Sequence, residues 1–105
     1  MDIKTIRKPL SQFVQQIPKS IKVDQVIIFG SYLEGKASQD SDIDVIVVSD
    51  DFKEFEDSQR LSILDTAAHD INPEIDAWGL TRAEVADADE LTTLGYARTS
   101  GIRFV

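Results

Sequence analysis

Apolar residues recur along the chain with a spacing that changes from helical to extended and back. Positions 6, 10, 13, 14 and 17 follow helical spacing and Pro18 follows them, which predicts an amphipathic helix over residues 9–17. The continuous apolar run of residues 26–29, which ends at Gly30, is typical of a strand buried on both faces. A second strand is predicted over residues 42–48, where β-branched residues follow Asp42 and Asp44.

The same alternation continues through the second half of the chain. A helix is predicted over residues 54–69, and a third strand over residues 74–80 contains Asp76. Thr81 and Glu84 form a capping-box signature that predicts a short helix, followed by a helix over 90–99 and a last strand over 102–105. This order predicts one α/β domain over residues 1–105, with a small mixed sheet packed against helices.

Composition narrows the functional classes. The 105 residues contain no cysteine, which excludes disulfides, thiolate catalysis and cysteine-rich zinc sites. No apolar run approaches the ~20 residues of a membrane span, so no membrane partner is expected. The net charge of −8 disfavours nucleic acid as a partner, because affinity for the phosphate backbone rests on clustered basic residues. Because the lack of cysteine gives no sign of an oxidising compartment, we expect a cytoplasmic protein.

The acidic residues of the two later strands are the strongest candidates for chemistry. Asp42 and Asp44 are two residues apart, so they lie on one face of a strand and repel each other unless a cation or a proton lies between them. The alternative places Asp42 in the preceding turn and Asp44 at an exposed edge. Asp76 follows a helical crossover and can lie beside the pair, or it is a surface residue near the start of its strand.

Three further residues could contact a phosphate. Gly30-Ser31 ends a buried strand, and a glycine there lets backbone N–H groups approach an anion, although such a dipeptide is also common in ordinary turns. Lys36 could bind a phosphate or be a surface lysine. With Asp42, Asp44 and Asp76 these residues could bind one or two Mg²⁺ ions and the triphosphate that the ions bridge.

Other residues and motifs are less informative. His69 has no partner histidine or cysteine nearby in the sequence, so we interpret it as a surface or capping residue. Phe29 and Trp78 are interpreted as core residues. No Gly-Lys-Ser/Thr or GxGxxG motif occurs, which removes the P-loop and Rossmann interpretations. Phosphatases and glycosyltransferases with a DxD motif place the apolar strand before the acids, whereas here it follows Asp44.

One spacing carries a family resemblance. Gly30-Ser31, ten residues, then Asp42-Ile43-Asp44 and an apolar strand resemble the signature of the minimal nucleotidyltransferases in the DNA polymerase beta-like superfamily. The resemblance implies the single-domain fold of that superfamily and a metal- and nucleotide-dependent transferase. Asp42 and Asp44 would be metal ligands and Asp76 the third acid. Many relatives have an arginine after Gly-Ser where this chain has Tyr32, so the choice of nucleotide is not defined.

The resemblance also implies a partner. Small members of the family are often antitoxins encoded beside a HEPN-domain ribonuclease toxin, which they bind and can inactivate by adding AMP to a tyrosine. By resemblance, this protein would be a Mg²⁺- and ATP-dependent protein adenylyltransferase that forms a hetero-oligomer with a HEPN toxin. Two alternatives stay open: neutralisation of the toxin by contact alone, and transfer of the nucleotide to a small molecule. The presence of all three acids favours catalysis.

Overall fold

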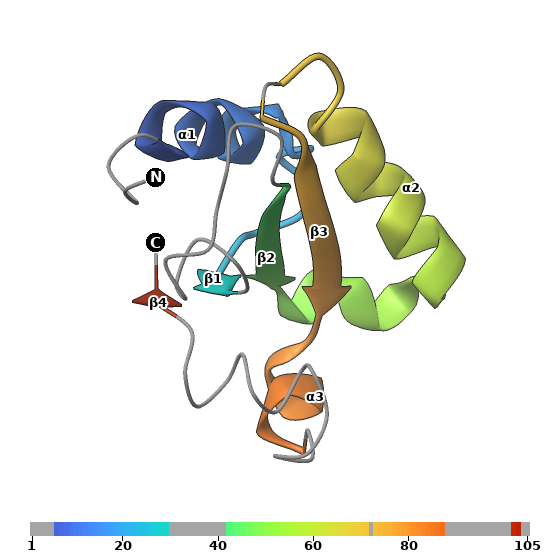
Figure 1. Ribbon diagram of the computed structural model, residues 1–105. Coiled ribbons are helices and arrows are strands. Elements are labelled where there is room, and N and C mark those ends of the chain that lie inside the picture. Colours follow the sequence, from blue (N-terminus) through green and yellow to red (C-terminus); the bar gives the residue numbers. More distant parts are fainter. Residues whose placement is uncertain (1–5, 30–41, 72, 88–101, 104–105) are drawn as a thin grey trace.

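The computed structural model describes residues 6–29, 42–71, 73–87 and 102–103 (Figure 1). In chain order the elements are α1 (Arg7–Gln16), β1 (Gln25–Phe29), β2 (Ile43–Val48), the 3₁₀ helix η3 (Asp50–Glu54), α2 (Asp57–Ala67), β3 (Ile75–Leu80), α3 (Arg82–Ala86) and β4 (Ile102–Arg103). No helix within these ranges is both long enough and apolar enough to span a bilayer.

The four strands form one mixed sheet in the order β3-β2-β1-β4. β1 pairs antiparallel with β2 and with β4, whereas β2 and β3 are parallel because η3 and α2 form the crossover between them. The predicted α/β class with a small mixed sheet is therefore confirmed. Within the described ranges, β3 forms one border of the sheet.

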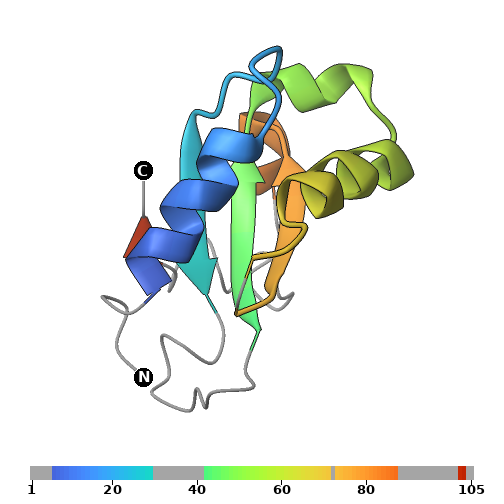
Figure 2. The same ribbon diagram turned by 90° about the horizontal axis from the view of Figure 1, so that it is seen from above.

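Helices α1 and α2 cover one face of the sheet. Figure 2 shows α1 crossing this face while α2 lies beside β3. Leu10 and Phe13 of α1 are fully buried in the same cluster as Leu64 of α2 and the alternate residues Val45 and Val47 of β2. Burial of the apolar stripe of each helix against the sheet is the main source of its stability.

A smaller apolar cluster lies on the opposite face. Ile27, Phe29, Ile46 and Val48 are buried there, with Trp78 packed against them. The rings of Phe29 and Trp78 are 5.5 Å apart between centroids, so both residues belong to the core, as interpreted from the sequence. Because side chains alternate along a strand, Asp44 and Asp76 lie on this second face.

The helix predicted over residues 54–69 is wrong at its start. Ser49 accepts a hydrogen bond from the Asp51 N–H at 3.2 Å and begins the separate η3 helix, whose Phe52 is fully buried. A capping box between Glu56 and Gln59 then starts α2. Local side-chain caps thus divide one apolar pattern into two helices.

The remaining element predictions are only partly within the described residues. The capping box of Thr81 and Glu84 is present and starts α3. The last strand is confirmed over Ile102–Arg103, and residues 104–105 lie outside the described ranges. The helix predicted over residues 90–99 also lies outside them.

Candidate functional site

The parallel register of β2 and β3 places two predicted site residues side by side. Asp44 is paired with Asp76, and on its other side Asp44 is paired with Phe29 of β1. Neighbouring strands lie about 4.8 Å apart, so the two aspartates are adjacent in one row across the second face. The sequence allowed this arrangement, and the register establishes it.

Burial and negative charge raise the pKa of both aspartates. Burial is the largest cause for Asp44, followed by the charges of Asp76 and Asp42. Burial is also the largest cause for Asp76, followed by the charges of Asp42 and of Asp65 on α2. Each carboxylate is therefore held where its charged form is disfavoured, which is typical of sites that bind a cation or a proton.

Asp42 lies one residue before β2 and is exposed, so its place just before the strand matches one of the alternatives considered from the sequence. Its charge nonetheless raises the pKa of both other acids. No group of three or more acidic or histidine side chains in the described ranges is arranged to hold a metal ion. The backbone thus supplies an adjacent pair, Asp44 and Asp76, with a third carboxylate nearby.

The chemistry of this donor set fits a divalent cation. No lysine, arginine or histidine within the described part of the chain forms an ion pair with Asp42, Asp44 or Asp76. Carboxylate oxygens are the ligands that Mg²⁺ prefers, and a bound cation would reverse the effect of the neighbouring negative charges on each pKa. The register already brings two of the three acids together.

The predicted phosphate-binding residues Gly30, Ser31 and Lys36 lie outside the described residues. Phe29 is the last described residue before them, and its partner in the register is Asp44. Their roles stay predictions. His69 is exposed, and its imidazole lies 3.4 Å from a carboxylate oxygen of Asp70, which agrees with a surface position.

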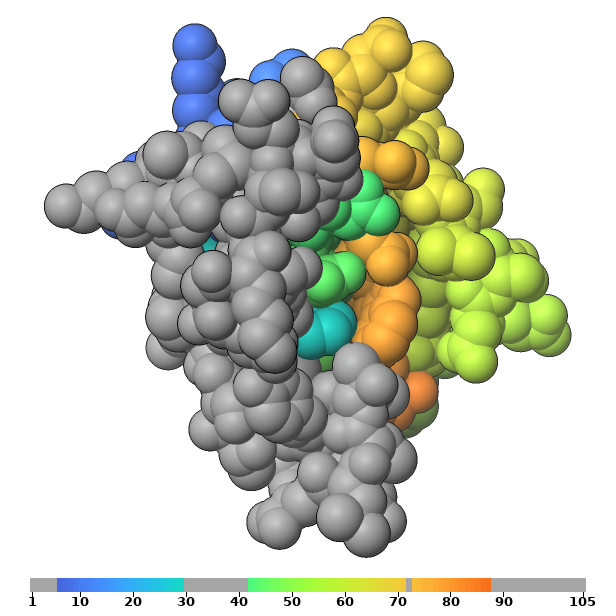
Figure 3. Space-filling model, viewed as in Figure 1, coloured from blue at the N-terminus to red at the C-terminus, as the bar shows by residue number. Residues whose placement is uncertain are grey.

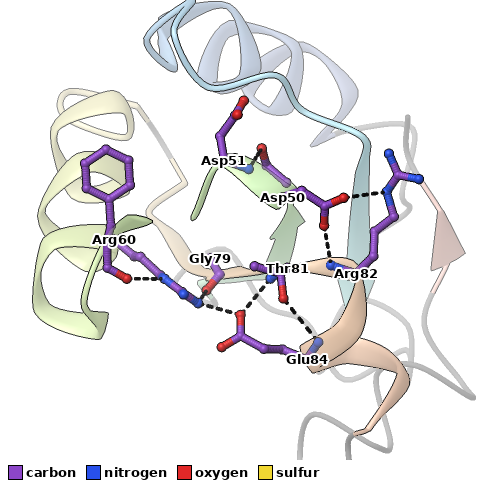
Figure 4. Close-up of polar contacts among 9 residues, drawn as sticks. Asp50, Asp51, Arg60, Gly79, Thr81, Arg82 and Glu84 are labelled. Carbon is purple, nitrogen blue, oxygen red and sulfur yellow. Dashed lines mark hydrogen bonds and ion pairs between the residues drawn. The ribbon is translucent and has the colours of Figure 1, made fainter. Parts of the chain in front are cut away.

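Arg60 is a buried cation that the sequence analysis did not single out (Figure 4). Its guanidinium donates to the carbonyls of Phe55 at 3.0 Å and Gly79 at 3.2 Å, and to a Glu84 carboxylate oxygen at 2.6 Å. That same oxygen accepts from the Thr81 N–H at 2.8 Å. Arg60 thereby joins α2 to the end of β3 and to the start of α3.

A signal for Arg60 was present in the sequence. Positions 60, 64 and 67 share one face of a helix, and the last two are the buried Leu64 and Ala67. A cation on an apolar stripe must find partners, because an unpaired buried charge is costly. The sequence did not reveal which carbonyls and which carboxylate would accept hydrogen bonds from Arg60, since these groups come from three other segments.

A mixed sheet covered by helices on one face, with paired aspartates on the other, defines an α/β domain with an acidic site. The sequence pattern of the nucleotidyltransferase domain family matches residues 4–91, and the chain belongs to this family. Domains of this family generally use a nucleoside triphosphate together with a divalent metal, which agrees with the donor set described above.

Two similar proteins extend the comparison. A putative protein adenylyltransferase of Methanocaldococcus jannaschii is 33% identical over 61 residues, which are 58% of this chain and 61% of that protein. The chain therefore spans less than two thirds of that relative's length. The crystal structure of a putative nucleotidyltransferase from Sulfolobus solfataricus superposes with a TM-score of 0.68 at 21% identity, over 95% of this chain and 79% of the other. This similarity confirms the fold.

Proposed function

We propose that this protein is a Mg²⁺-dependent adenylyltransferase that transfers AMP from ATP to a hydroxyl group of a protein partner. The observation that carries the proposal is the pairing of the half-buried Asp44 with the exposed Asp76 on one face, without a compensating cation among the described side chains. Membership of the nucleotidyltransferase domain family supports nucleotidyl transfer. The similarity to a protein that is named as a putative protein adenylyltransferase supports AMP and a protein acceptor.

The proposed roles follow from the positions of the acids. Asp42, Asp44 and Asp76 would hold one or two Mg²⁺ ions, while Gly30, Ser31 and Lys36 would bind the phosphates. When bound, Mg²⁺ supplies positive charge that neutralises the triphosphate and the charge developing on the leaving pyrophosphate. The acceptor oxygen forms a bond to the α-phosphorus as the bond to pyrophosphate breaks. Asp76, at the border of the sheet, would receive the proton of the hydroxyl.

The proposed acceptor is a tyrosine of a HEPN ribonuclease toxin, which makes the protein an antitoxin. This choice rests on the spacing from Gly30-Ser31 to Asp42 and Asp44, which resembles the minimal nucleotidyltransferases of such pairs. A partner protein would then bring the hydroxyl to Asp76.

One experiment tests this function. The protein is incubated with Mg²⁺, labelled ATP and the product of the adjacent gene, and the partner is analysed by mass spectrometry for the addition of one AMP. Asp44→Asn should abolish the label, whereas Asp87→Asn, which makes the same charge change at the exposed C-cap of α3, should retain it. Neutralisation of the partner by wild type and by Asp44→Asn alike, with no label in either, would establish contact alone as the mechanism.

A further inference from the structure

A groove between α2 and β3 lies next to the acidic site and is not used by the chemistry proposed above. Asp57, Arg60 and Leu61 of α2 form one wall, and residues 77–80 of β3 form the other. We refer to it as the α2–β3 groove. Its volume of about 270 Å³ is below the ~300–1,000 Å³ of small-molecule sites, so it suits one side chain better than a whole nucleotide.

The groove is apolar and open to solvent. Leu61 is 47% exposed and is the large hydrophobic residue that the described part of the chain leaves most accessible. Trp78 and Leu80, both partly buried, continue the apolar surface on β3. Figure 3 shows β3 at the surface beside α2 in this region. Tryptophan is enriched at the centre of protein-binding surfaces, and Leu61 adds exposed apolar area beside Trp78.

The groove lies at the border of the sheet, between α2, which covers the first face, and Trp78, which packs on the second face with Asp76. Trp78 follows Asp76 by two residues, so the two side chains lie on the same face about 7 Å apart along β3. Asp44 lies on the inner side of Asp76, and β3 forms the border of the sheet within the described ranges. A chain that approaches Asp76 from outside the sheet therefore passes the α2–β3 groove.

The charges around the groove indicate what kind of partner would bind there. Among the described residues, Arg60 is the one cation in the lining, and its guanidinium is already bound to Phe55, Gly79 and Glu84. Asp57 at the rim is exposed, and Asp65 on the same helix is close enough to raise the pKa of Asp76. The rim therefore favours a partner with basic residues.

We propose that the α2–β3 groove docks an extended, basic segment of the acceptor protein. The segment inserts an apolar side chain between Leu61 and Trp78 and presents a hydroxyl-bearing side chain two residues away, beside Asp76. This inference rests on the proposed adenylyl transfer, since it names the surface that receives the acceptor. Two-residue spacing follows because an extended segment has the same rise per residue as β3.

The test uses the single tryptophan of the chain, Trp78, as the reporter of occupancy. A synthetic acetylated peptide, Lys-Tyr-Val-Leu-Lys, is titrated into the protein with excitation selective for tryptophan, and Glu-Tyr-Val-Leu-Glu serves as the charge control. We expect saturable binding of the basic peptide and at least about tenfold weaker binding of the acidic one. Leu61→Arg should weaken the basic peptide by at least about tenfold, because it fills the groove and repels lysine.

Ser62→Arg is the matched control, since Ser62 is an exposed neighbour on α2 that does not line the groove. It should bind the basic peptide like wild type, and Leu61→Ala should give an intermediate loss without added charge. Equal binding of the basic peptide by wild type and Leu61→Arg, or equal binding of both peptides by wild type, overturns the docking proposal. Peptide binding with the expected dependence but no AMP transfer by wild type overturns the proposed function and leaves the docking surface standing.

Discussion

Neutralisation of Asp76 is expected to stabilise the protein in the absence of divalent cations. Asp76→Asn keeps the shape of the side chain and removes a charge that faces Asp44 across the parallel register. Two unit charges about 5 Å apart repel by about 0.8 kcal/mol in water and by about 3 kcal/mol at an effective dielectric constant of 20. Asp76 is exposed, so we expect a gain near the lower limit, about 1 kcal/mol.

The pH dependence gives the sign of the effect. Burial, followed by the charges of Asp42 and Asp65, raises the pKa of Asp76 above the ordinary 3.8. The folded protein therefore holds a proton that the unfolded chain releases, and stability is lost as the pH rises through the raised pKa. The gain in the free energy of unfolding from Asp76→Asn should be full at neutral pH and should disappear as the pH falls to about 3.8.

Urea unfolding in EDTA, followed by the fluorescence of Trp78, measures the free energy of unfolding. A gain of about 1 kcal/mol corresponds to roughly 4–8 °C in Tm for a domain of this size. Mg²⁺ should then stabilise wild type by about 1.4 kcal/mol at ten times its dissociation constant, and Asp76→Asn by clearly less. Asp87→Asn should change stability by less than about 0.5 kcal/mol. A variant Asp76→Asn that is less stable than wild type in EDTA would refute the proposed strain between the carboxylates.

Three further predictions concern the packing behind the site. Arg60→Met should lower the free energy of unfolding by about 2–4 kcal/mol, because it leaves two carbonyls and Glu84 without their donor. Urea titration measures this loss. A double-mutant cycle with Glu84→Gln should show a coupling energy above about 1 kcal/mol. Gly79→Ala should cost about 1–3 kcal/mol, since its Cβ would lie 3.0 Å from the buried Phe52 ring; a smaller cost in a Phe52→Leu background, measured by thermal unfolding, would confirm the clash. Burial acts to raise the pKa of Glu84, but hydrogen bonds from Thr81 and Arg60 together lower it below the ordinary 4.5. Glu84→Gln should therefore lose most of its destabilising effect as the pH falls from 4.5 through that lowered pKa. Measurement of the free energy of unfolding during an acid titration would show this loss.

The sequence by itself predicted the order of the four strands and of α1, α2 and α3, together with the acidic side chains that the strands carry. The apolar run at residues 26–29 and the β-branched residues within 42–48 predicted two strands. The two-residue spacing of Asp42 and Asp44 predicted that they share a face, because strand periodicity is local. The Thr81–Glu84 capping box was also visible, since its hydrogen bonds join residues three apart. The start of α2 was predicted too early because the caps at Ser49 and at Glu56–Gln59 begin two separate helices, and the burial of Phe52, a tertiary contact, supports the first of them.

Only the tertiary structure decided which acid faces which. The register that pairs Asp44 with Asp76 depends on how the η3–α2 crossover packs, and no local pattern fixes a contact between residues so far apart along the chain. The partners of Arg60 and the α2–β3 groove arise in the same way, from segments that meet only when α2 packs beside β3. Short-range periodicity thus fixed the elements and their faces, whereas long-range packing fixed the site.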